Sequence, residues 1–368
     1  MIKTVLVAAG GTGGHIYPGL AIAETLRKRH PDWQITFIGS ETGMEAKIVP
    51  EYGFPMDYIR VSGFDRGNPV KMLRAAMKMT ASRKDAKKLL KKHNPDLVIG
   101  TGGYTSGILL YVAGKAGIPA LIHEQNAFPG KANRLAASSA SCVALTFDEA
   151  KTYFGNARTE LCGNPVRDAF KHINPAKCRE QIGVSADKRV ILATGGSQGA
   201  ASINEAMLKV AEAYKGNPKV EIYHLIGPKK YDELMAEAVS LGIDQFDNIH
   251  LMDYSNNMDV LMGAADVLIS RAGATTIAEM SASGTPAVLV PYPFAAGDHQ
   301  RFNAQAVVDA GAGIMIEDSD LTGELLLATV NELLFDTKKL EVFKQNALAY
   351  AKPEAGDKIA DIAESLIS

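Results

Sequence analysis

The first residues with chemical potential form a glycine-rich turn near the start of the sequence. The turn reads GGTGG at 10–14, follows the apolar run 4–8, and is followed at once by His15. Glycines between a strand and a helix let backbone N–H groups converge on an anion, and an imidazole there can accept a proton. We expect the helix to begin after Pro18. The same glycines would also suit a plain strand-to-helix turn.

Two further glycine turns follow strand-like runs. The second glycine turn reads GGSQGA at 195–200, where Ser197 adds a hydroxyl, and the third glycine turn reads GTGGYTSG from Gly100. The second turn lacks the Gly-Lys-Ser/Thr ending of a P-loop, so magnesium-dependent nucleotide hydrolysis is not indicated. The first turn does not match a nicotinamide-binding fingerprint, because Ile16 stands where the third glycine belongs. Three glycine turns at strand ends indicate more than one phosphate group in the ligands.

A third constellation lies at 270–293, SRAGATTIAEMSASGTPAVLVPYP. We expect Thr275 and Thr276 to cap a helix and Glu279 to lie about one turn later on the same face. A carboxylate there can accept hydrogen bonds from the vicinal diol of a ribose. The plain alternative is that a first-turn glutamate only stabilises the helix through its dipole. Another helix is expected to begin with three polar residues, which suit either sugar hydroxyls or plain capping: Asp298, His299 and Gln300.

The elements that must position these residues alternate along the chain. Apolar runs predict strands at 4–8, 34–38, 97–99, 120–123 and 142–145, and again at 190–193, 220–225, 267–269, 287–290 and 313–316. Amphipathic segments separate them, so the pattern predicts an α/β protein with parallel sheets covered by helices. Each half opens strand–glycines–helix. We therefore expect two Rossmann-like, doubly wound domains that face a cleft.

The domain boundary is expected near Gly163, where Gly-Asn-Pro interrupts any regular element. Residues 1–163 then form an N-terminal domain. Residues 164–350 form a C-terminal domain. We expect residues 351–368 to form a final helix that packs back on the N-terminal domain.

Length and composition exclude several classes of protein. The 368 residues exceed one typical domain, and a 46% hydrophobic and 22% charged composition is that of a soluble globular protein. A net charge of −2 argues against a nucleic acid partner. The three cysteines form no Cys-x-x-Cys pair, and the sequence suggests neither a metal site nor a bilayer-spanning run. The short apolar start does not read as a signal peptide, so we expect a cytoplasmic protein that can be peripheral to a membrane.

Seven motifs occur in an order that resembles one enzyme family. They are GGTGGH, IGTGGYTSG, HEQNAFPG, GNPVR, GGSQGA, SRAGATTIAE and DHQRFNA. As a set they resemble the MurG family, the bacterial UDP-N-acetylglucosamine:undecaprenyl-pyrophosphoryl-MurNAc-pentapeptide N-acetylglucosaminyltransferases. The resemblance implies a GT-B fold and an inverting transfer of GlcNAc from UDP-GlcNAc to the MurNAc 4-hydroxyl of lipid I. The product would be lipid II of peptidoglycan synthesis, and no cofactor or metal is implied.

The resemblance also implies that the N-terminal domain, 1–163, takes the acceptor and faces the membrane, and that the C-terminal domain, 164–350, binds UDP-GlcNAc. It implies roles for particular residues as well. Ser197 would meet the donor pyrophosphate, Glu279 the ribose, and the backbone of Met252 the uracil edge. Asn126 and Gln300 would hold the GlcNAc hydroxyls. The other donor-binding residues would be Thr12, Gly13, Gly14, Arg167, Ala274, Thr275 and Thr276. The loops for the acceptor and its phosphates would contain Gly11, Gly103, Tyr104 and Asn133.

Two residues are candidates for the general base. His15 stands at a helix start, where the dipole disfavours an imidazolium, so a neutral ring can take the proton of the attacking hydroxyl. It could instead bond a phosphate or cap the turn. Glu124 is the second candidate, or it orients the acceptor. Two other functions stay open: another GT-B UDP-sugar enzyme, such as a glycolipid synthase or a UDP-sugar epimerase, and a nucleotide-sugar-binding protein without catalysis.

The segment 69–95 predicts where the protein meets a membrane. Read as a helix, its first half places Met72, Leu73 and Met77 on one side and basic residues on the other. We expect these apolar residues to enter the inner leaflet at the cytoplasmic face of the bacterial cell membrane, while the cations meet anionic lipid. The second half reads as an ordinary sheet-covering helix with a solvated lysine face. The plain alternative is that both halves pack on the sheet.

Overall fold

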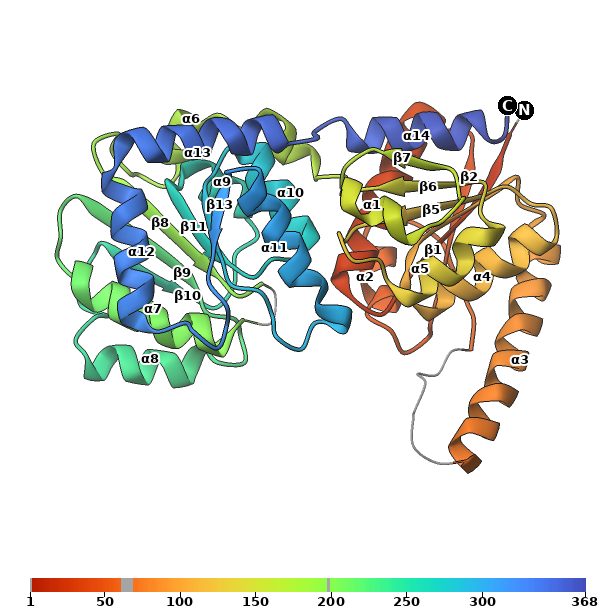
Figure 1. The fold of residues 1–368 in the computed structure, drawn as a ribbon, viewed down its shortest axis with the longest axis horizontal. Helices are drawn as coiled ribbons and strands as arrows, with labels where there is room; N and C mark the ends of the chain where they lie inside the picture. The colour runs from red at the N-terminus through yellow and green to blue at the C-terminus, as the bar shows by residue number, and fades with distance from the viewer. Residues whose placement is uncertain (1, 61–68, 197–198) are drawn as a thin grey trace. The chain divides into compact units, whose positions relative to one another are not determined.

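The computed structural model describes the fold of residues 2–60, 69–196 and 199–368, and the side chains of these residues except 69–79. Two units divide the chain (Figure 1). Unit 1 comprises Met1–Pro165 together with Glu354–Ser368, and unit 2 comprises Val166–Pro353. The chain therefore crosses from one unit to the other twice. The crossings, after Pro165 and after Pro353, lie two and three residues beyond the expected boundaries at 163 and 350.

Unit 1 is built on a parallel sheet of seven strands. They are β1 (Thr4–Ala9), β2 (Gln34–Gly39), β3 (Met56–Tyr58), β4 (Leu97–Gly102), β5 (Ala120–Glu124), β6 (Cys142–Leu145) and β7 (Thr159–Leu161). The strand order is β3-β2-β1-β4-β5-β6-β7. The order reverses between the neighbours β1 and β4, and the carboxyl ends of such a pair are where doubly wound sheets bind ligands. The first and third glycine turns follow these two strands.

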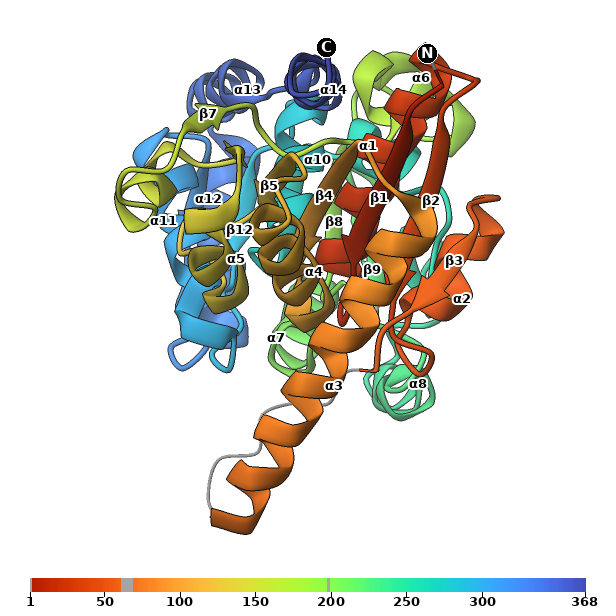
Figure 2. The ribbon, with the colours of Figure 1, turned by 90° about the vertical axis from the view of Figure 1, so that its right-hand side faces the viewer.

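Helices cover both faces of the unit 1 sheet. They are α1 (Gly13–Arg29), α2 (Glu45–Glu51), α3 (Pro69–His93), α4 (Gly103–Lys115), α5 (Lys131–Ala136) and α14 (Ala355–Ser365), with 3-10 turns η1 (Ala137–Ser139) and η2 (Asp148–Tyr153). Alternate residues of β1 serve the two faces. Val5 and Val7 pack in one cluster with α1 and α14, and Leu6 and Ala8 pack in another with α3 and α4. Figure 2 shows α3 extending beyond the other elements of unit 1.

The return of α14 to unit 1 is secured by apolar and ionic contacts with α1. Ile359 and Ala363 are fully buried in the same cluster as Leu26. Arg29 bonds Asp357 at 2.8 Å, Asp361 at 2.6 Å and Glu364 at 3.2 Å, and these carboxylates raise the pKa of its guanidinium. The two chain ends lie close together in Figure 1. The C-terminal segment is thus part of the core of unit 1.

Unit 2 repeats the design with six parallel strands. They are β8 (Arg189–Thr194), β9 (Val220–Leu225), β10 (Ile249–Met252), β11 (Val267–Ser270), β12 (Ala287–Leu289) and β13 (Gly313–Met315). Their order is β10-β9-β8-β11-β12-β13. The order reverses between β8 and β11, whose carboxyl ends lead into GGSQGA and SRAGATTIAE. The predicted α/β fold with two doubly wound parallel sheets is confirmed.

The helices of unit 2 again lie on both faces of the sheet. They are α6 (Pro175–Gln181), α7 (Ala201–Tyr214), α8 (Tyr231–Ser240), α9 (Met258–Ala264), α10 (Ala274–Ser283), α11 (His299–Asp309), α12 (Gly323–Phe335) and α13 (Thr337–Tyr350), with 3-10 turns η3 (Asp168–His172) and η4 (Ala296–Asp298). One core cluster joins Ile191 and Ile269 to residues of α7 and α12, such as Met207 and Val330. The unit 2 sheet is therefore covered by apolar packing on the α7–α12 side.

The ten predicted strands all occur, with ends that differ by up to three residues. The structure adds three strands that the apolar pattern missed: β3, β7 and β10. All three lie at sheet edges. An edge strand is covered less completely, so it does not require a continuous apolar run. Met56 and Asp57, for example, are only half-buried.

Candidate functional site

The first glycine turn wraps around a buried carboxylate. Glu45 Oε2 accepts the Gly11 N–H at 3.2 Å, and its Oε1 accepts the Ser40 N–H at 2.9 Å. A Cβ at Gly10 would lie 2.7 Å from Glu45 Oε1, so a larger residue there would displace this carboxylate. The Gly11 N–H, expected to face a phosphate, is therefore engaged within the protein. Sequence reasoning missed Glu45 because nothing in its local pattern marks it.

Helix α1 begins at Gly13, so the expectation that it begins after Pro18 is wrong. Pro18 lies inside the helix and is buried. Thr12 is the N-cap in extended conformation, and its side chain makes no capping bond. The helix N-terminus thus presents backbone N–H groups of Gly13 and Gly14 without a side-chain cap. This arrangement suits an anion, because the first N–H groups of a helix have no partner within it.

The third glycine turn packs directly against the first. Gly102 and Gly103 have φ of 125° and 86°, a backbone conformation that favours glycine. A Cβ at Gly102 would lie 2.5 Å from His15 Nδ1, and a Cβ at Gly103 would lie 2.5 Å from the Gly10 carbonyl oxygen. The hydroxyl of Thr101 donates to the His15 carbonyl oxygen at 2.8 Å. The end of β4 therefore supports both the backbone and the ring of His15.

His15 also meets the HEQN motif at the end of β5. Its Nδ1 lies 3.1 Å from Gln125 Oε1, and its side chain is half-buried. Among the described residues, no protein group bonds its Nε2. One nitrogen of the ring is thus anchored and the other remains available, which is the arrangement that a general base needs.

Glu124, the second candidate base, is fully engaged. Its Oε1 accepts from the backbone and side-chain nitrogens of Asn126 at 3.0 and 3.2 Å. Its Oε2 accepts from the Gly130 N–H at 3.1 Å and from Asn133 Nδ2 at 2.9 Å. The residue is only 1% exposed. A buried carboxylate with four donors holds its loop in shape, so the geometry favours His15 as the base.

The other residues expected on the acceptor side differ in accessibility. Tyr104, at the start of α4, is 54% exposed. Asn133 is buried at 2% and bonds Glu124 and the His123 carbonyl oxygen. It therefore supports the HEQN loop from behind instead of lying on the surface.

In unit 2, Arg167 and Glu279 form an ion pair. Arg167 Nε and Nη2 each lie 2.9 Å from Glu279 Oε1. Burial raises the pKa of Glu279, and the charge of Arg167 opposes this shift. In the part of the chain that the structure describes, Glu279 Oε2 has no hydrogen-bond partner. Glu279 can therefore keep its ion pair with Arg167 through Oε1 and accept a hydrogen bond from a ligand through Oε2.

The predicted capping of α10 by threonines is wrong. The N-cap is Gly273, and Thr275 and Thr276 lie inside the first turn of the helix. The Thr275 hydroxyl is buried without a hydrogen-bond partner among the described residues. Ala274 is the first helical residue. Gln300 is the second residue of α11. Its Oε1 accepts the Tyr292 N–H at 3.0 Å, so its amide nitrogen is the group left for a sugar hydroxyl.

The second glycine turn is tightly packed on both sides of Ser197, which itself lies outside the described residues. Gly196 and Gly199 have φ of 80° and 76°. A Cβ at Gly199 would lie 2.1 Å from the Ile226 carbonyl oxygen, and one at Gly195 would lie 2.1 Å from the Ala200 nitrogen. These contacts require glycine for close backbone approach, next to the start of α7.

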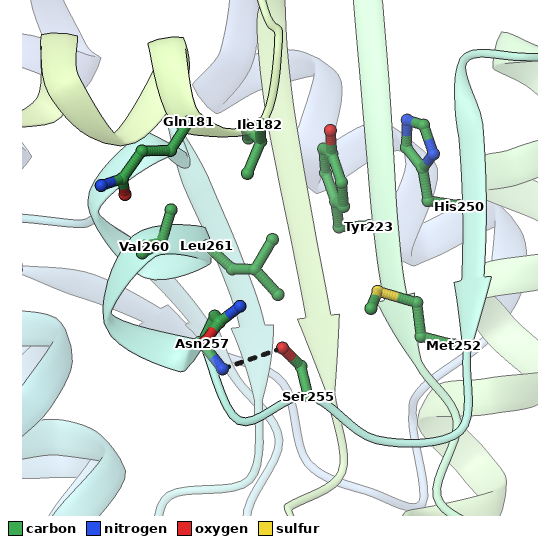
Figure 3. Close-up of a pocket in the computed structure, with 9 residues that line it drawn as sticks. All are labelled: Gln181, Ile182, Tyr223, His250, Met252, Ser255, Asn257, Val260 and Leu261. Carbon is green, nitrogen blue, oxygen red and sulfur yellow. Dashed lines mark hydrogen bonds between the residues drawn. The ribbon is translucent and has the colours of Figure 1, made fainter.

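A pocket of about 570 Å³ opens beside β9 and β10 (Figure 3). The rings of Tyr223 and His250 stack on these strands, with centroids 4.3 Å apart and planes 18° from parallel. Met252, Ser255 and Asn257 line the pocket where β10 ends. Figure 3 shows the hydrogen bond from the Asn257 nitrogen to Ser255 Oγ, which measures 3.1 Å.

The backbone of Met252 is less available than the sequence suggested. Its carbonyl oxygen accepts the Ile226 N–H at 2.8 Å, and the residue pairs with Leu225 in the β9–β10 ladder. The backbone N–H and C=O of a strand residue point to the same side, so both groups of Met252 face β9. Ser255 follows in the turn, and among the described residues its backbone N–H and C=O have no partner. Ser255 is therefore the better position for reading the edge of a base.

Comparison with known proteins assigns both units. The glycosyltransferase family 28 N-terminal domain matches residues 5–145, and the C-terminal domain of the same family matches residues 190–366. A relative from Desulforudis audaxviator, a UDP-N-acetylglucosamine--N-acetylmuramyl-(pentapeptide) pyrophosphoryl-undecaprenol N-acetylglucosamine transferase, is 42% identical over 98% of each chain. The chain belongs to this glycosyltransferase family.

Solved structures agree with membership of family 28. The crystal structure of Acinetobacter baumannii MurG covers 99% of this chain and 99% of its own, with 30% identity and a TM-score of 0.80. The fold is therefore GT-B, and the chain is a UDP-GlcNAc-dependent glycosyltransferase. A UDP-GlcNAc 2-epimerase from Neisseria meningitidis is also similar, with a TM-score of 0.69. Its identity is only 16% over 99% of this chain and 100% of its own, so it shows a shared fold alone.

The described part of the chain contains neither a membrane-spanning helix nor a cluster of metal ligands. None of its helices is long and apolar enough to cross a membrane. The same residues contain no group of three or more histidine, cysteine or acidic side chains that could hold a metal ion. Met72, Leu73 and Met77 belong to α3, but their side chains lie outside the described residues.

Proposed function

We propose that this chain transfers GlcNAc from UDP-GlcNAc to the MurNAc 4-hydroxyl of undecaprenyl-pyrophosphoryl-MurNAc-pentapeptide, with inversion, and that His15 is the general base. Family membership supports the substrates and the product lipid II. One observation carries the catalytic role: His15 has an anchored Nδ1 and an available Nε2 at the start of α1. The helix N-terminus disfavours the imidazolium and so keeps the ring ready to accept a proton.

The proposed chemistry divides between proton transfer and leaving-group departure. His15 Nε2 takes the proton as the acceptor oxygen attacks the anomeric carbon, and the bond to UDP breaks through a transition state with oxocarbenium character. Negative charge then gathers on the UDP phosphates. Backbone N–H groups of the second glycine turn and of the α7 start, together with the Ser197 hydroxyl, stabilise that charge.

For the donor, we propose that Glu279 binds the ribose through Oε2 while Arg167 holds Oε1. The buried hydroxyl of Thr275 and the amide nitrogen of Gln300 are further contacts for the donor. The backbone of Ser255, instead of Met252, reads the uracil edge. Ser255→Pro, which removes the N–H, should weaken UDP binding roughly two- to tenfold, because hydrogen bonds typically contribute ~0.5–1.5 kcal/mol. Ser255→Ala keeps the N–H and is the matched control.

The decisive experiment incubates the protein with labelled UDP-GlcNAc and lipid I and separates the products. We expect lipid II and UDP, and UDP-GlcNAc alone should give no epimer. His15→Gln should lower kcat by roughly 10²–10⁴ while UDP affinity, measured by calorimetry, stays within twofold. A His15→Gln enzyme with parental kcat would refute the base role, and an epimer of UDP-GlcNAc would favour the alternative function.

We further propose that anionic lipid binds beside α3 at the cytoplasmic membrane face. A pocket of about 820 Å³ lies between α3 and α4 and is lined by five cations: Arg83, Lys84, Lys87, Lys91 and Lys115. Tyr111 lies in the same pocket, and Arg83 stacks over its ring at 5.2 Å. Ala86, Leu89 and Leu90 are buried against the sheet, as expected for this half of the helix. Its lysine face is exposed, as expected, and Lys84, Lys87 and Lys91 of this face also line the groove.

Vesicle sedimentation tests the lipid proposal. Each basic residue near an anionic surface contributes ~1 kcal/mol, so Lys84→Glu with Lys87→Glu should lower binding to phosphatidylglycerol vesicles more than tenfold. Lys338→Glu with Lys344→Glu on α13 of unit 2 makes the same change in net charge and serves as the control. Equal binding by the two double variants would refute this surface. Leu73→Glu with Met77→Glu tests the first half of α3 in the same assay.

A further inference from the structure

A chain of hydrogen bonds in unit 1 joins His15 to two buried residues and ends on the backbone. His15 Nδ1 lies 3.1 Å from Gln125 Oε1, and Gln125 Nε2 lies 2.9 Å from His123 Nδ1. His123 Nε2 lies 3.1 Å from the Gly163 carbonyl oxygen. His123 is fully buried and Gln125 is 1% exposed, so solvent has little access to these bonds.

The direction of every bond in this chain can be read from its far end. The Gly163 carbonyl oxygen can only accept, so His123 Nε2 must carry a proton. Burial lowers the pKa of His123 to about 4, so the ring is neutral near pH 7 and holds only that one proton. His123 Nδ1 is therefore an acceptor. Thr146 Oγ1, 3.4 Å from His123 Nε2, shares the same ring proton at longer range.

The orientation of the Gln125 amide follows from two independent contacts. The same amide atom lies 2.9 Å from His123 Nδ1 and 3.0 Å from the His123 carbonyl oxygen. Both partners accept, so this atom must be the NH₂ group, and the amide oxygen must face His15. An amide oxygen only accepts a hydrogen bond. His15 Nδ1 must therefore carry a proton, which leaves the lone pair on Nε2.

We propose that Gln125 and His123 are positioning residues that fix the tautomer of His15 and make Nε2 its basic atom. This inference rests on the proposed function of His15 as general base. A histidine base is commonly oriented by a partner on its other nitrogen, and the partner sets which nitrogen is protonated. Here the partner is a neutral amide, which is itself oriented by a buried imidazole. Gln125 thus selects the tautomer without placing a negative charge next to His15.

The tautomers can be measured directly in the unmodified full-length protein. Long-range proton–nitrogen NMR spectra of the chain labelled with ¹⁵N-histidine distinguish a protonated Nδ1 from a protonated Nε2. His15→Gln and His123→Gln spectra assign the two rings by difference. We expect near pH 7.5 a protonated Nδ1 on His15 and a protonated Nε2 on His123. A His15 ring protonated on Nε2 would overturn the proposal, whatever its activity.

Two substitutions at Gln125 separate a tautomer effect from loss of packing. Gln125→Met fills the space without an acceptor, so His15 should become a mixture of tautomers and kcat should fall 10–100-fold, the usual cost of removing such a partner. Gln125→Glu still accepts from His15 Nδ1, so it should keep the His15 tautomer and retain more kcat than Gln125→Met. Equal losses of kcat in the two variants, with unchanged tautomers, would overturn the proposal.

The control is Thr146→Val, which removes a second contact of His123 but leaves the Gly163 carbonyl oxygen as acceptor. It should change neither tautomer and should keep kcat within twofold. Failure of the proposed positioning role and failure of the proposed base role give different results. A protonated Nε2 on His15 rejects the positioning role of Gln125 and His123. A protonated Nδ1 together with full activity of His15→Gln supports the positioning role and rejects His15 as the base.

Discussion

Gly102→Ala tests how far the third glycine turn determines the position of the His15 ring. Gly102 has φ 125° and ψ 174°, a region that only glycine occupies readily, and forcing alanine into it costs ~1–3 kcal/mol. The new Cβ would also lie 2.5 Å from His15 Nδ1 and 2.6 Å from Cε1. Ordinary contacts between such atoms need ~3.5 Å, so the ring must move by about 1 Å. A displacement of that size can lower kcat about 10²-fold.

The assay pairs steady-state transfer of labelled GlcNAc with urea unfolding. Gly117→Ala is the matched control, because Gly117 also has a positive φ, 75°, but no atom lies within 4 Å of its Cβ. That variant should lose ~1–2 kcal/mol of stability and keep its kcat. UDP affinity should be unchanged in both proteins. If Gly102→Ala turns over like Gly117→Ala, the ring of His15 does not depend on the turn, and the reasoning is refuted.

Three further predictions concern the donor, pH and the packing of α14. Glu279→Ala should weaken UDP-GlcNAc binding at least tenfold in calorimetry, since a charged hydrogen-bonding partner contributes ~1.5–3 kcal/mol, and it should abolish any preference for UDP over 2′-deoxy-UDP. Burial lowers the pKa of His224 to about 4, below its unfolded value of 6.5, so the native state resists protonation and loses stability as pH falls between these values. The free energy of unfolding should fall by about 3 kcal/mol over that pH window. In urea titrations the free energy of unfolding of His224→Asn should fall correspondingly less, and the same pH dependence in parent and variant would contradict this. Arg29→Ala should lower the stability of unit 1 by ~1–3 kcal/mol because three carboxylates lose their shared partner, whereas Arg301→Ala, which breaks one exposed pair with Glu317, should cost less than ~1 kcal/mol.

The fold was predictable wherever a strand is buried on both faces. Such strands, β1 and β8 among them, must be apolar throughout, so their runs stand out in the sequence. The edge strands β3, β7 and β10 lack that requirement and were missed. The start of α1 was misjudged at Pro18 because a proline more often begins a helix than lies within one. The cysteines behave as expected for structural thiols: burial raises the pKa of Cys162 to about 12.

The candidate site was predictable only where one short motif contains all its parts. His15, Glu279 and Gln300 were predicted as site residues because glycine turns and helix starts mark their neighbourhood. Glu45 and the orientation of Gln125 escaped, because each depends on a residue distant in sequence that the fold brings near. Glu45 meets Gly11 across 34 positions, and Gln125 meets His15 across 110. The lysines of α3 were noticed, but their groove required knowledge of where α4 lies.

The return of α14 to unit 1 has a consequence for biosynthesis. Residues 354–368 are translated after the whole of unit 2, so the core of unit 1 stays incomplete until these residues have been made. Until they arrive, Leu26 and its neighbours on α1 expose apolar surface, and Arg29 lacks its three carboxylates. Unit 2 is contiguous in the sequence, so its core needs no segment that is translated later. A protein truncated after Pro353 should therefore contain a protease-resistant unit 2 and a protease-sensitive unit 1.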